Sequence, residues 1–64
     1  MYILTNEPAG GLGKEAFDAL DNAFGTGEFS QGQAITVLAN ALESSNAESL
    51  LRELVSGGYV TEID

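Results

Sequence analysis

Apolar residues recur at helical spacing in three stretches of the chain, 14–24, 31–43 and 45–56. Within each stretch they stand three or four positions apart, and polar residues fill many of the positions between them. Residues with that spacing share one face of a helix, so the pattern predicts three short amphipathic helices. Their inward faces are expected to meet in one core, built from Phe17, Leu20, Phe24, Ile35, Leu38, Leu42, Ala47, Leu50, Leu51, Leu54 and Val55.

Capping signals mark where these helices begin and end. Ser30 is followed three positions later by Gln33, and Ser45 is followed at the same distance by Glu48. A serine with Glu or Gln three residues on is the capping-box pattern of a helix N-terminus, so both serines are predicted to start a helix. Glycines supply the stops after the first and third helices, at Gly25, Gly57 and Gly58.

Two β-prone segments lie outside the helices. Residues 1–6, MYILTN, are too few for a stable helix and carry three β-compatible residues in a row, which favours a strand. Residues 59–63, YVTEI, alternate between two faces as a strand does. An exposed lone strand is unstable and prone to aggregate. We therefore expect the two segments to pair antiparallel, either within one chain or by exchange between two copies.

The segments that join these elements are short. Residues 7–13, EPAGGLG, contain the only proline and three glycines, which predicts a loop. Residues 26–29 form a connector with room for a single β bridge. The chain, 1–64, is therefore expected to be one small domain, mostly α with a small β part. Three helices would lie beside a two-stranded antiparallel sheet in which the N-terminal strand pairs with the C-terminal strand.

Charge is the strongest feature of the composition. Ten acidic residues stand against two basic ones, Lys14 and Arg52, which gives a formal net charge of −8. Scattered acids with almost no lysine resemble the surfaces of proteins from salt-loving archaea, where about 1 M salt shortens the Debye length to about 3 Å. The alternative is a surface shaped for a basic partner, or one that mimics nucleic acid. The sequence is compatible with both interpretations.

Residue types that perform catalysis or bind metals are scarce. The chain has no cysteine and no histidine, which excludes disulfides and the usual zinc sites. Gly13 and Lys14 match only the end of a phosphate-binding loop, and the glycine pattern before them is missing. A calcium loop beginning at Asp21 would lack alternate oxygen ligands and end on Gly32, where a bidentate Glu is needed. We therefore expect no enzymatic activity, no metal and no cofactor.

Export and membrane signals are missing from the sequence. No apolar run approaches the roughly 20 residues that span a bilayer, and the N-terminus lacks a basic segment followed by an apolar one. The sequence therefore predicts a soluble, cytoplasmic protein.

The order helix, short connector, helix, three-residue turn, helix, strand resembles that of a winged helix-turn-helix domain. Residues 37–63, VLANALESSNAESLLRELVSGGYVTEI, are similar to the part of bacterial and archaeal regulators that carries the recognition helix. The family's L-x-x-L-x-x-x-G-[LY]-[VI] ending is matched by Leu51, Leu54, Gly58, Tyr59 and Val60. The resemblance covers residues 14–63. It departs from the family at position 43, where a Glu stands in a turn that often carries glycine, and in offering one wing strand after the third helix.

The resemblance implies that the exposed face of the third helix enters the DNA major groove, with flanking basic residues on phosphates. By position, that face comprises Ser44, Asn46, Glu48, Ser49, Arg52 and Glu53. Asn46, Ser49 and Arg52 suit contacts to base edges, whereas Glu48 and Glu53 have the wrong sign for phosphate unless salt screens them. The family therefore implies a DNA-binding regulator. The charge implies instead a protein-interaction module facing a basic partner.

Overall fold

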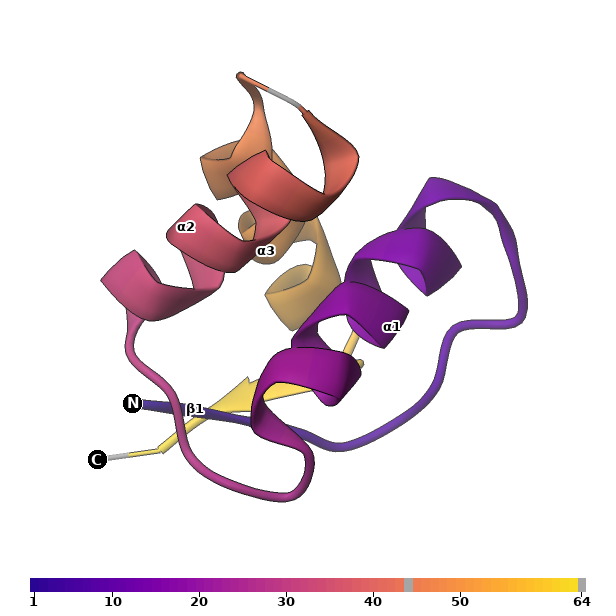
Figure 1. The fold of residues 1–64 in the computed structure, drawn as a ribbon. Helices are drawn as coiled ribbons and strands as arrows, with labels where there is room; N and C mark the ends of the chain where they lie inside the picture. The colour runs from indigo at the N-terminus through magenta and orange to yellow at the C-terminus, as the bar shows by residue number, and fades with distance from the viewer. Residues whose placement is uncertain (44, 64) are drawn as a thin grey trace.

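The structure, a computed structural model, describes residues 1–43 and 45–63. Within these residues the chain forms three helices and two short strands (Figure 1). In chain order the elements are β1 (Tyr2–Leu4), α1 (Gly11–Phe24), α2 (Gln31–Leu42), α3 (Ala47–Ser56) and β2 (Val60–Glu62). β1 and β2 form a two-stranded antiparallel sheet. The fold is mostly α with a small β part, as the hydrophobic pattern predicts.

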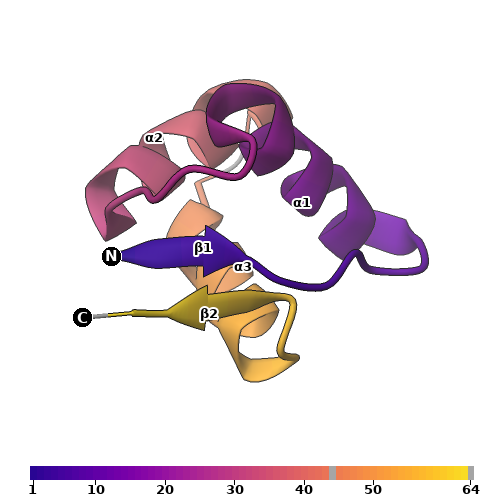
Figure 2. The same cartoon turned by 90° about the horizontal axis from the view of Figure 1, so that it is seen from below.

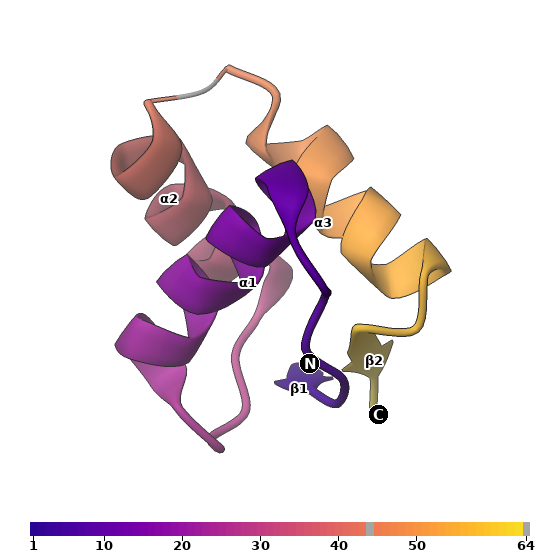
Figure 3. The same cartoon turned by 90° about the vertical axis from the view of Figure 1, so that its right-hand side faces the viewer.

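The three helices pack against one another, and the sheet closes one end of the bundle (Figures 1 and 3). β2 packs on α3 and β1 contacts α1. The buried cluster where these elements meet consists of Ala16, Leu20, Phe29, Ala34, Leu38, Ala47, Leu50, Leu51, Leu54 and Val60. This confirms the predicted inward face of α3, since its four buried residues all lie in this cluster and Val55 packs against them.

Aromatic side chains occupy different places in the core from those predicted. Phe29, which the sequence places in a connector, is fully buried. Phe24 and Leu42 are only half-buried and pack at the edge of the cluster, because each is the last residue of its helix. Phe17 is buried but lies outside the main cluster. The connector, rather than the end of α1, therefore supplies the central aromatic ring.

The two strands lie side by side and run in opposite directions (Figure 2). Ile3 is opposite Thr61, and backbone hydrogen bonds extend the same pairing beyond the ends of the two strands. The Thr5 N–H donates to the Tyr59 carbonyl at 2.9 Å, and the Ile63 N–H donates to the Met1 carbonyl at 2.8 Å. The predicted antiparallel pairing is confirmed, and it forms here within one chain. The regular strands are shorter than the predicted ranges 1–6 and 59–63.

The connector between α1 and α2 adds one more pair to the sheet. Phe29 forms an isolated antiparallel bridge with Tyr2 on the edge of β1 that faces away from β2. The Tyr2 N–H donates to the Phe29 carbonyl at 2.7 Å, and the Phe29 N–H donates back to the Tyr2 carbonyl at 3.0 Å. This confirms the single β bridge predicted for the connector. β1 therefore holds the connector in place and with it the buried ring of Phe29.

α1 begins at Gly11, three residues before the predicted start at Lys14. Glycine is a poor helix former, and the glycines of 7–13 favoured a loop on local grounds alone. Tertiary contacts outweigh that preference. The buried ring of Pro8 lies beside Gly13, where an added Cβ would be 3.8 Å from the Cβ of Pro8. Glu7 also reaches Lys14 across this turn. The prediction of a loop through Gly13 is therefore wrong at its C-terminal end.

The predicted capping box at the start of α2 is confirmed. The Gln33 N–H donates to the Ser30 hydroxyl at 3.1 Å, and the Ser30 N–H donates to the Gln33 side-chain oxygen at 2.8 Å. The corresponding prediction for Ser45 is wrong, because α3 begins at Ala47 with Asn46 at the N-cap. Ala47 is buried in the core, so packing sets the first turn one residue further along than the capping pattern indicates.

α3 ends in a Schellman motif, and the chain continues directly from it into β2. The Gly58 N–H donates to the Val55 carbonyl at 3.1 Å, and the Tyr59 N–H donates to the Leu54 carbonyl at 3.0 Å. Gly58 has a φ of 82°, a conformation that glycine adopts without strain. At Gly57 a Cβ would lie 2.6 Å from the Tyr59 ring. Glycine is therefore needed at position 58 for its backbone conformation and at position 57 for the space taken by the Tyr59 ring.

Glu43 ends α2 in the left-handed region, with φ 49° and ψ 41°. A residue with a side chain is strained by about 1–2 kcal/mol in this conformation, and glycine is not. Glycine also gives the unfolded chain more freedom, which offsets part of the gain. The sequence is therefore not optimised for stability at this turn.

Replacing Glu43 with glycine should raise the free energy of unfolding by about 0.5–1 kcal/mol, because the relief of strain exceeds the entropy lost. Urea unfolding followed by circular dichroism measures the change. Glu43→Gln is the matched control, since it removes the same charge and keeps the strained backbone. If the free energy of unfolding rises equally in the two variants, the loss of charge and not the relief of backbone strain accounts for the effect.

Candidate functional site

The outward face of α3 is the candidate site that the resemblance indicates. Its side chains are exposed because the helix buries the opposite stripe, Ala47, Leu50, Leu51 and Leu54, in the core. The exposed residues are Asn46 at the N-cap and, along the helix, Glu48, Ser49, Arg52, Glu53 and Ser56. Five of the six residues that the resemblance assigns to this face are thus on one accessible surface. The sixth, Ser44, lies outside the described residues.

Arg52 is the one basic residue of α3, and it lies beside an acid of its own helix. Its guanidinium Nη2 is 3.3 Å from the Glu48 Oε1, one helical turn earlier. Both side chains are well exposed, at 77% and 59%, so the pair contributes well under about 1 kcal/mol to stability. Glu53 adds a second carboxylate to the same face. The face therefore carries two acids and one base.

A small hollow lies at one side of this face. It has a volume of about 100 Å³ and brings together parts of the chain that are far apart in sequence. The residues that line it are Tyr2 of β1, Gln31 of α2, and Glu48, Leu51, Arg52 and Val55 of α3. Tyr2 and Gln31 thus belong to the surroundings of the candidate site. Sequence reasoning missed both, since neither is periodic with α3.

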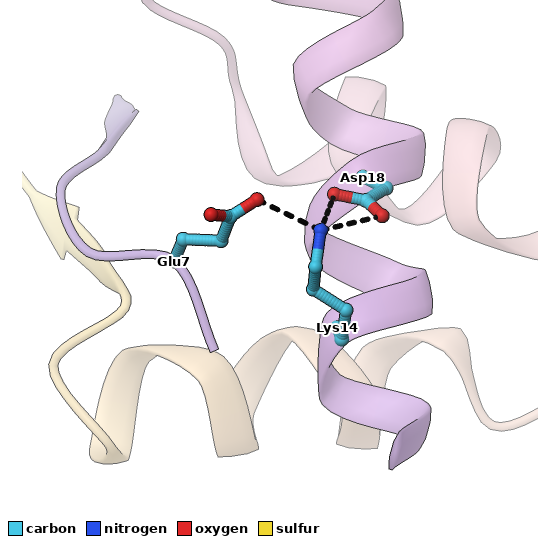
Figure 4. A network of polar contacts seen from close by, with 3 residues as sticks. All are labelled: Glu7, Lys14 and Asp18. Atoms are coloured by element: carbon cyan, nitrogen blue, oxygen red, sulfur yellow. Dashed lines mark hydrogen bonds and ion pairs between the residues drawn. The ribbon is translucent and has the colours of Figure 1, made fainter. Parts of the chain in front are cut away.

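Lys14, the other basic side chain, is held by two carboxylates (Figure 4). Its Nζ lies 2.7 Å from Glu7 Oε1 and 2.7 Å from Asp18 Oδ1. The pKa of Lys14 is raised above its usual value, first by the hydrogen bond to Asp18 and then by the one to Glu7. The two ion pairs of Lys14 link the loop before α1 to the helix itself. The charge of Lys14 is already balanced within the molecule.

These contacts decide the electrostatic character of the surface. Both basic side chains of the chain pair with acids of the same molecule, at distances of 2.7–3.3 Å. Further exposed acids, among them Glu15, Asp21, Glu28 and Glu62, are on the surface outside these pairs. The described surface therefore presents negative charge, including on α3. It is complementary to a positively charged partner.

Comparison of the chain with known protein families, curated proteins and solved structures finds no match.

Two further observations concern metal binding and membranes. In residues 1–43 and 45–63, no cluster of three or more acidic side chains is arranged to hold a metal ion. Nor does any helix within these ranges have the length and apolar character needed to cross a membrane.

Proposed function

We propose that this chain is a small winged-helix-like binding module, without catalytic activity, whose partner is a basic protein. The observation that carries the proposal is the ion pair between Arg52 and Glu48. The one base that α3 offers is matched by an acid of its own helix, and Glu53 remains as excess negative charge on the exposed face. Such a face attracts lysine and arginine side chains and repels phosphate.

DNA binding is the second candidate, and the order of elements favours it. Three helices followed by a strand match the resemblance, and β1 takes the place of the second wing strand by pairing with β2. Asn46, Ser49 and Arg52 are exposed where base contacts would be made. Because the pair of Arg52 with Glu48 is exposed, moving Arg52 to a phosphate costs little. Even so, Arg52 is the one basic side chain on this face, so binding would release few counterions from the DNA and gain little affinity.

Adaptation to high salt would account for the acidity without any partner. Eight excess negative charges on a domain of this size repel one another, and the repulsion is relieved when the chain expands. Salt should therefore stabilise the fold, with much of the gain from screening complete by about 1 M. A thermal melt that does not change with salt would contradict this explanation and leave the basic partner as the reason for the charge.

A fluorescent peptide of lysine, glycine and serine tests the proposed function. We expect it to bind at low salt and to be released as salt rises. Glu53→Lys should weaken binding about tenfold, because a reversal on the contact face replaces an attraction of about 1 kcal/mol with a repulsion. Glu15→Lys on α1 is the matched control, since it makes the same change of net charge on another face and should weaken binding less.

A duplex DNA titration at the same salt concentrations distinguishes the two candidates. With so few cations on the surface, any DNA binding should have a shallow salt slope, well below about −0.9 per phosphate contact. Tight duplex binding with a steep negative slope, together with no binding of the basic peptide, would overturn the proposal in favour of the regulator. Equal weakening by Glu53→Lys and Glu15→Lys would place the contact away from α3.

A further inference from the structure

α2 differs from the rest of the molecule in carrying no charge. None of its twelve residues, Gln31–Leu42, is acidic or basic, although the chain has ten acids and α1 and α3 each carry several. Half of these residues are nevertheless exposed: Gln31, Gly32, Gln33, Thr36, Asn40 and Ala41. Exposed helix faces are where charged side chains normally lie. An uncharged exposed face is therefore unusual in a protein with this composition.

This face contains an open groove of about 480 Å³ with a mostly apolar lining. The groove lies between the end of α1 and the first half of α2. It is lined by Phe24, Gly32, Gln33, Thr36 and Val37. Phe24 and Val37 are half-buried, so they offer apolar surface to the groove while packing on the core at its edge. A side chain of a partner placed here would bury apolar area that is now in contact with water.

Gly32 lies on the wall of this groove, and nothing within the described residues requires a glycine there. A Cβ at this position would meet no atom within 4 Å, and the backbone is not in the left-handed region. Gly32 is the second residue of α2, so glycine costs less there than the roughly 0.5–1 kcal/mol relative to alanine of a helix interior. No contact in the described part of the chain offsets that cost. Space above a glycine is useful where another molecule approaches the backbone closely.

Two exposed acidic residues are close in sequence to Phe24, on the α1 side of the groove, and indicate the charge of what would occupy it. Asp21 is one helical turn before Phe24 on α1 and therefore on the same side of that helix. Glu28 lies in the connector that joins the two helix ends. Both side chains are exposed and neither pairs with Lys14 or Arg52. A second copy of this chain would bring another net charge of −8 to these acids, which disfavours self-association.

We propose that this groove binds a segment of a basic protein that carries one apolar anchor flanked by lysine or arginine. The anchor would lie over Gly32 between Phe24 and Val37, and the flanking cations would face Asp21 and Glu28. The inference rests on the proposed function, because it takes the basic partner from there and adds the place where its apolar part binds. It makes α2 a second contact surface in addition to the acidic face of α3.

A displayed library of random peptides, selected against the immobilised protein, provides the probe. We expect selected peptides to combine basic residues with a single large apolar residue. The affinity of a synthesised peptide is then measured by fluorescence anisotropy for the parent protein and for Gly32→Leu, whose side chain would occupy the groove. The variant should bind about tenfold or more weakly, because an apolar anchor of this size loses its burial.

Gly32→Ala is the matched control for the backbone. Both substitutions favour the helix, and a Cβ at this position meets no atom within 4 Å, so we expect both variants to melt at or above the temperature of the parent. The alanine side chain fills little of the groove, so this variant should retain more of the affinity for the peptide than the leucine variant does. Replacing the anchor of the peptide with alanine should weaken binding to the parent but cause little further loss with Gly32→Leu, since the two changes remove the same contact.

The outcomes separate this inference from the proposed function. Basic peptides without an apolar anchor that bind Gly32→Leu as well as the parent, but are weakened by Glu53→Lys, would overturn the groove and keep the basic partner. Anchored peptides without basic residues would overturn the assignment of a basic occupant. A dimer in sedimentation that is lost in Gly32→Leu would also overturn the proposal, because a second copy would then occupy the groove.

Discussion

Phe29→Ala should lower the free energy of unfolding by about 3–5 kcal/mol, because it removes a whole aromatic ring from the core. The side chain of Phe29 is fully buried. Its ring stacks on Phe24 with centroids 4.7 Å apart and lies 6.2 Å from the ring of Tyr2. A domain of this length has roughly 3–10 kcal/mol in total, so this one substitution should remove a large share of the stability.

Urea unfolding followed by circular dichroism measures this loss, and two further variants control it. Phe29→Leu retains most of the apolar volume and should cost only about 1–2 kcal/mol. Phe24→Ala removes an equally large ring from a half-buried position and should cost less than Phe29→Ala. An unfolding midpoint for Phe29→Ala equal to that of the parent would contradict the burial of this ring.

Deleting residues 1–5 should abolish cooperative unfolding, because β1 holds both β2 and the connector. The deletion removes the hydrogen bond that Met1 accepts from Ile63, the one that Thr5 donates to Tyr59, and both bonds between Tyr2 and Phe29. At about 1 kcal/mol each, these bonds alone approach the stability of such a domain. The freed edge of β2 would also be open to pairing with other chains. Near-ultraviolet circular dichroism and sedimentation measure the loss of packing and any aggregation.

A matched pair of substitutions in β1 separates packing from strand length. Leu4 packs against the core cluster, and Ile3, the neighbouring residue, does not belong to it. Successive side chains of a strand point to opposite faces, so Leu4→Ala should destabilise the protein clearly more than Ile3→Ala. Equal effects would mean that the two faces of β1 are not distinct. A truncated protein that stays folded and monomeric would contradict the role given to β1.

The helices and the pairing of the strands could be predicted from the sequence because both follow from periodicity. A stripe with a period of 3.6 must be buried, and a lone β-prone segment needs a partner. Phe29 could not be assigned in the same way. It stands alone in a short connector with no period, and its place in the core depends on tertiary contacts, among them the bridge to Tyr2 and the stacking on Phe24. The start of α1 at Gly11 also depends on tertiary contacts that no local preference indicates.

The candidate site was predictable to a similar extent. The phase of α3 shows which residues are exposed, so the positions of Asn46, Ser49, Arg52 and Glu53 follow from the burial of Leu51 and its neighbours. The contribution of Tyr2 and Gln31 to the small hollow could not be predicted in this way, because it depends on where β1 and α2 lie relative to α3. The pairing of Lys14 with Asp18 is local, at four positions along one helix, whereas its contact with Glu7 requires the loop to fold back.

The sheet also joins the first and the last parts of the chain to be synthesised. Thr5 and its partner Tyr59 are 54 positions apart, so Thr5 is made roughly 3–11 s before Tyr59 at the usual rates of translation. Helices form within microseconds, which leaves ample time for α1 and α2 to appear while β1 is still unpaired. Closing so long a loop lowers the entropy of the chain before the contacts of the sheet stabilise it. We therefore expect pairing of β1 with β2 to come late in folding, and a newly made chain to carry an uncovered apolar segment until its own C-terminal strand emerges.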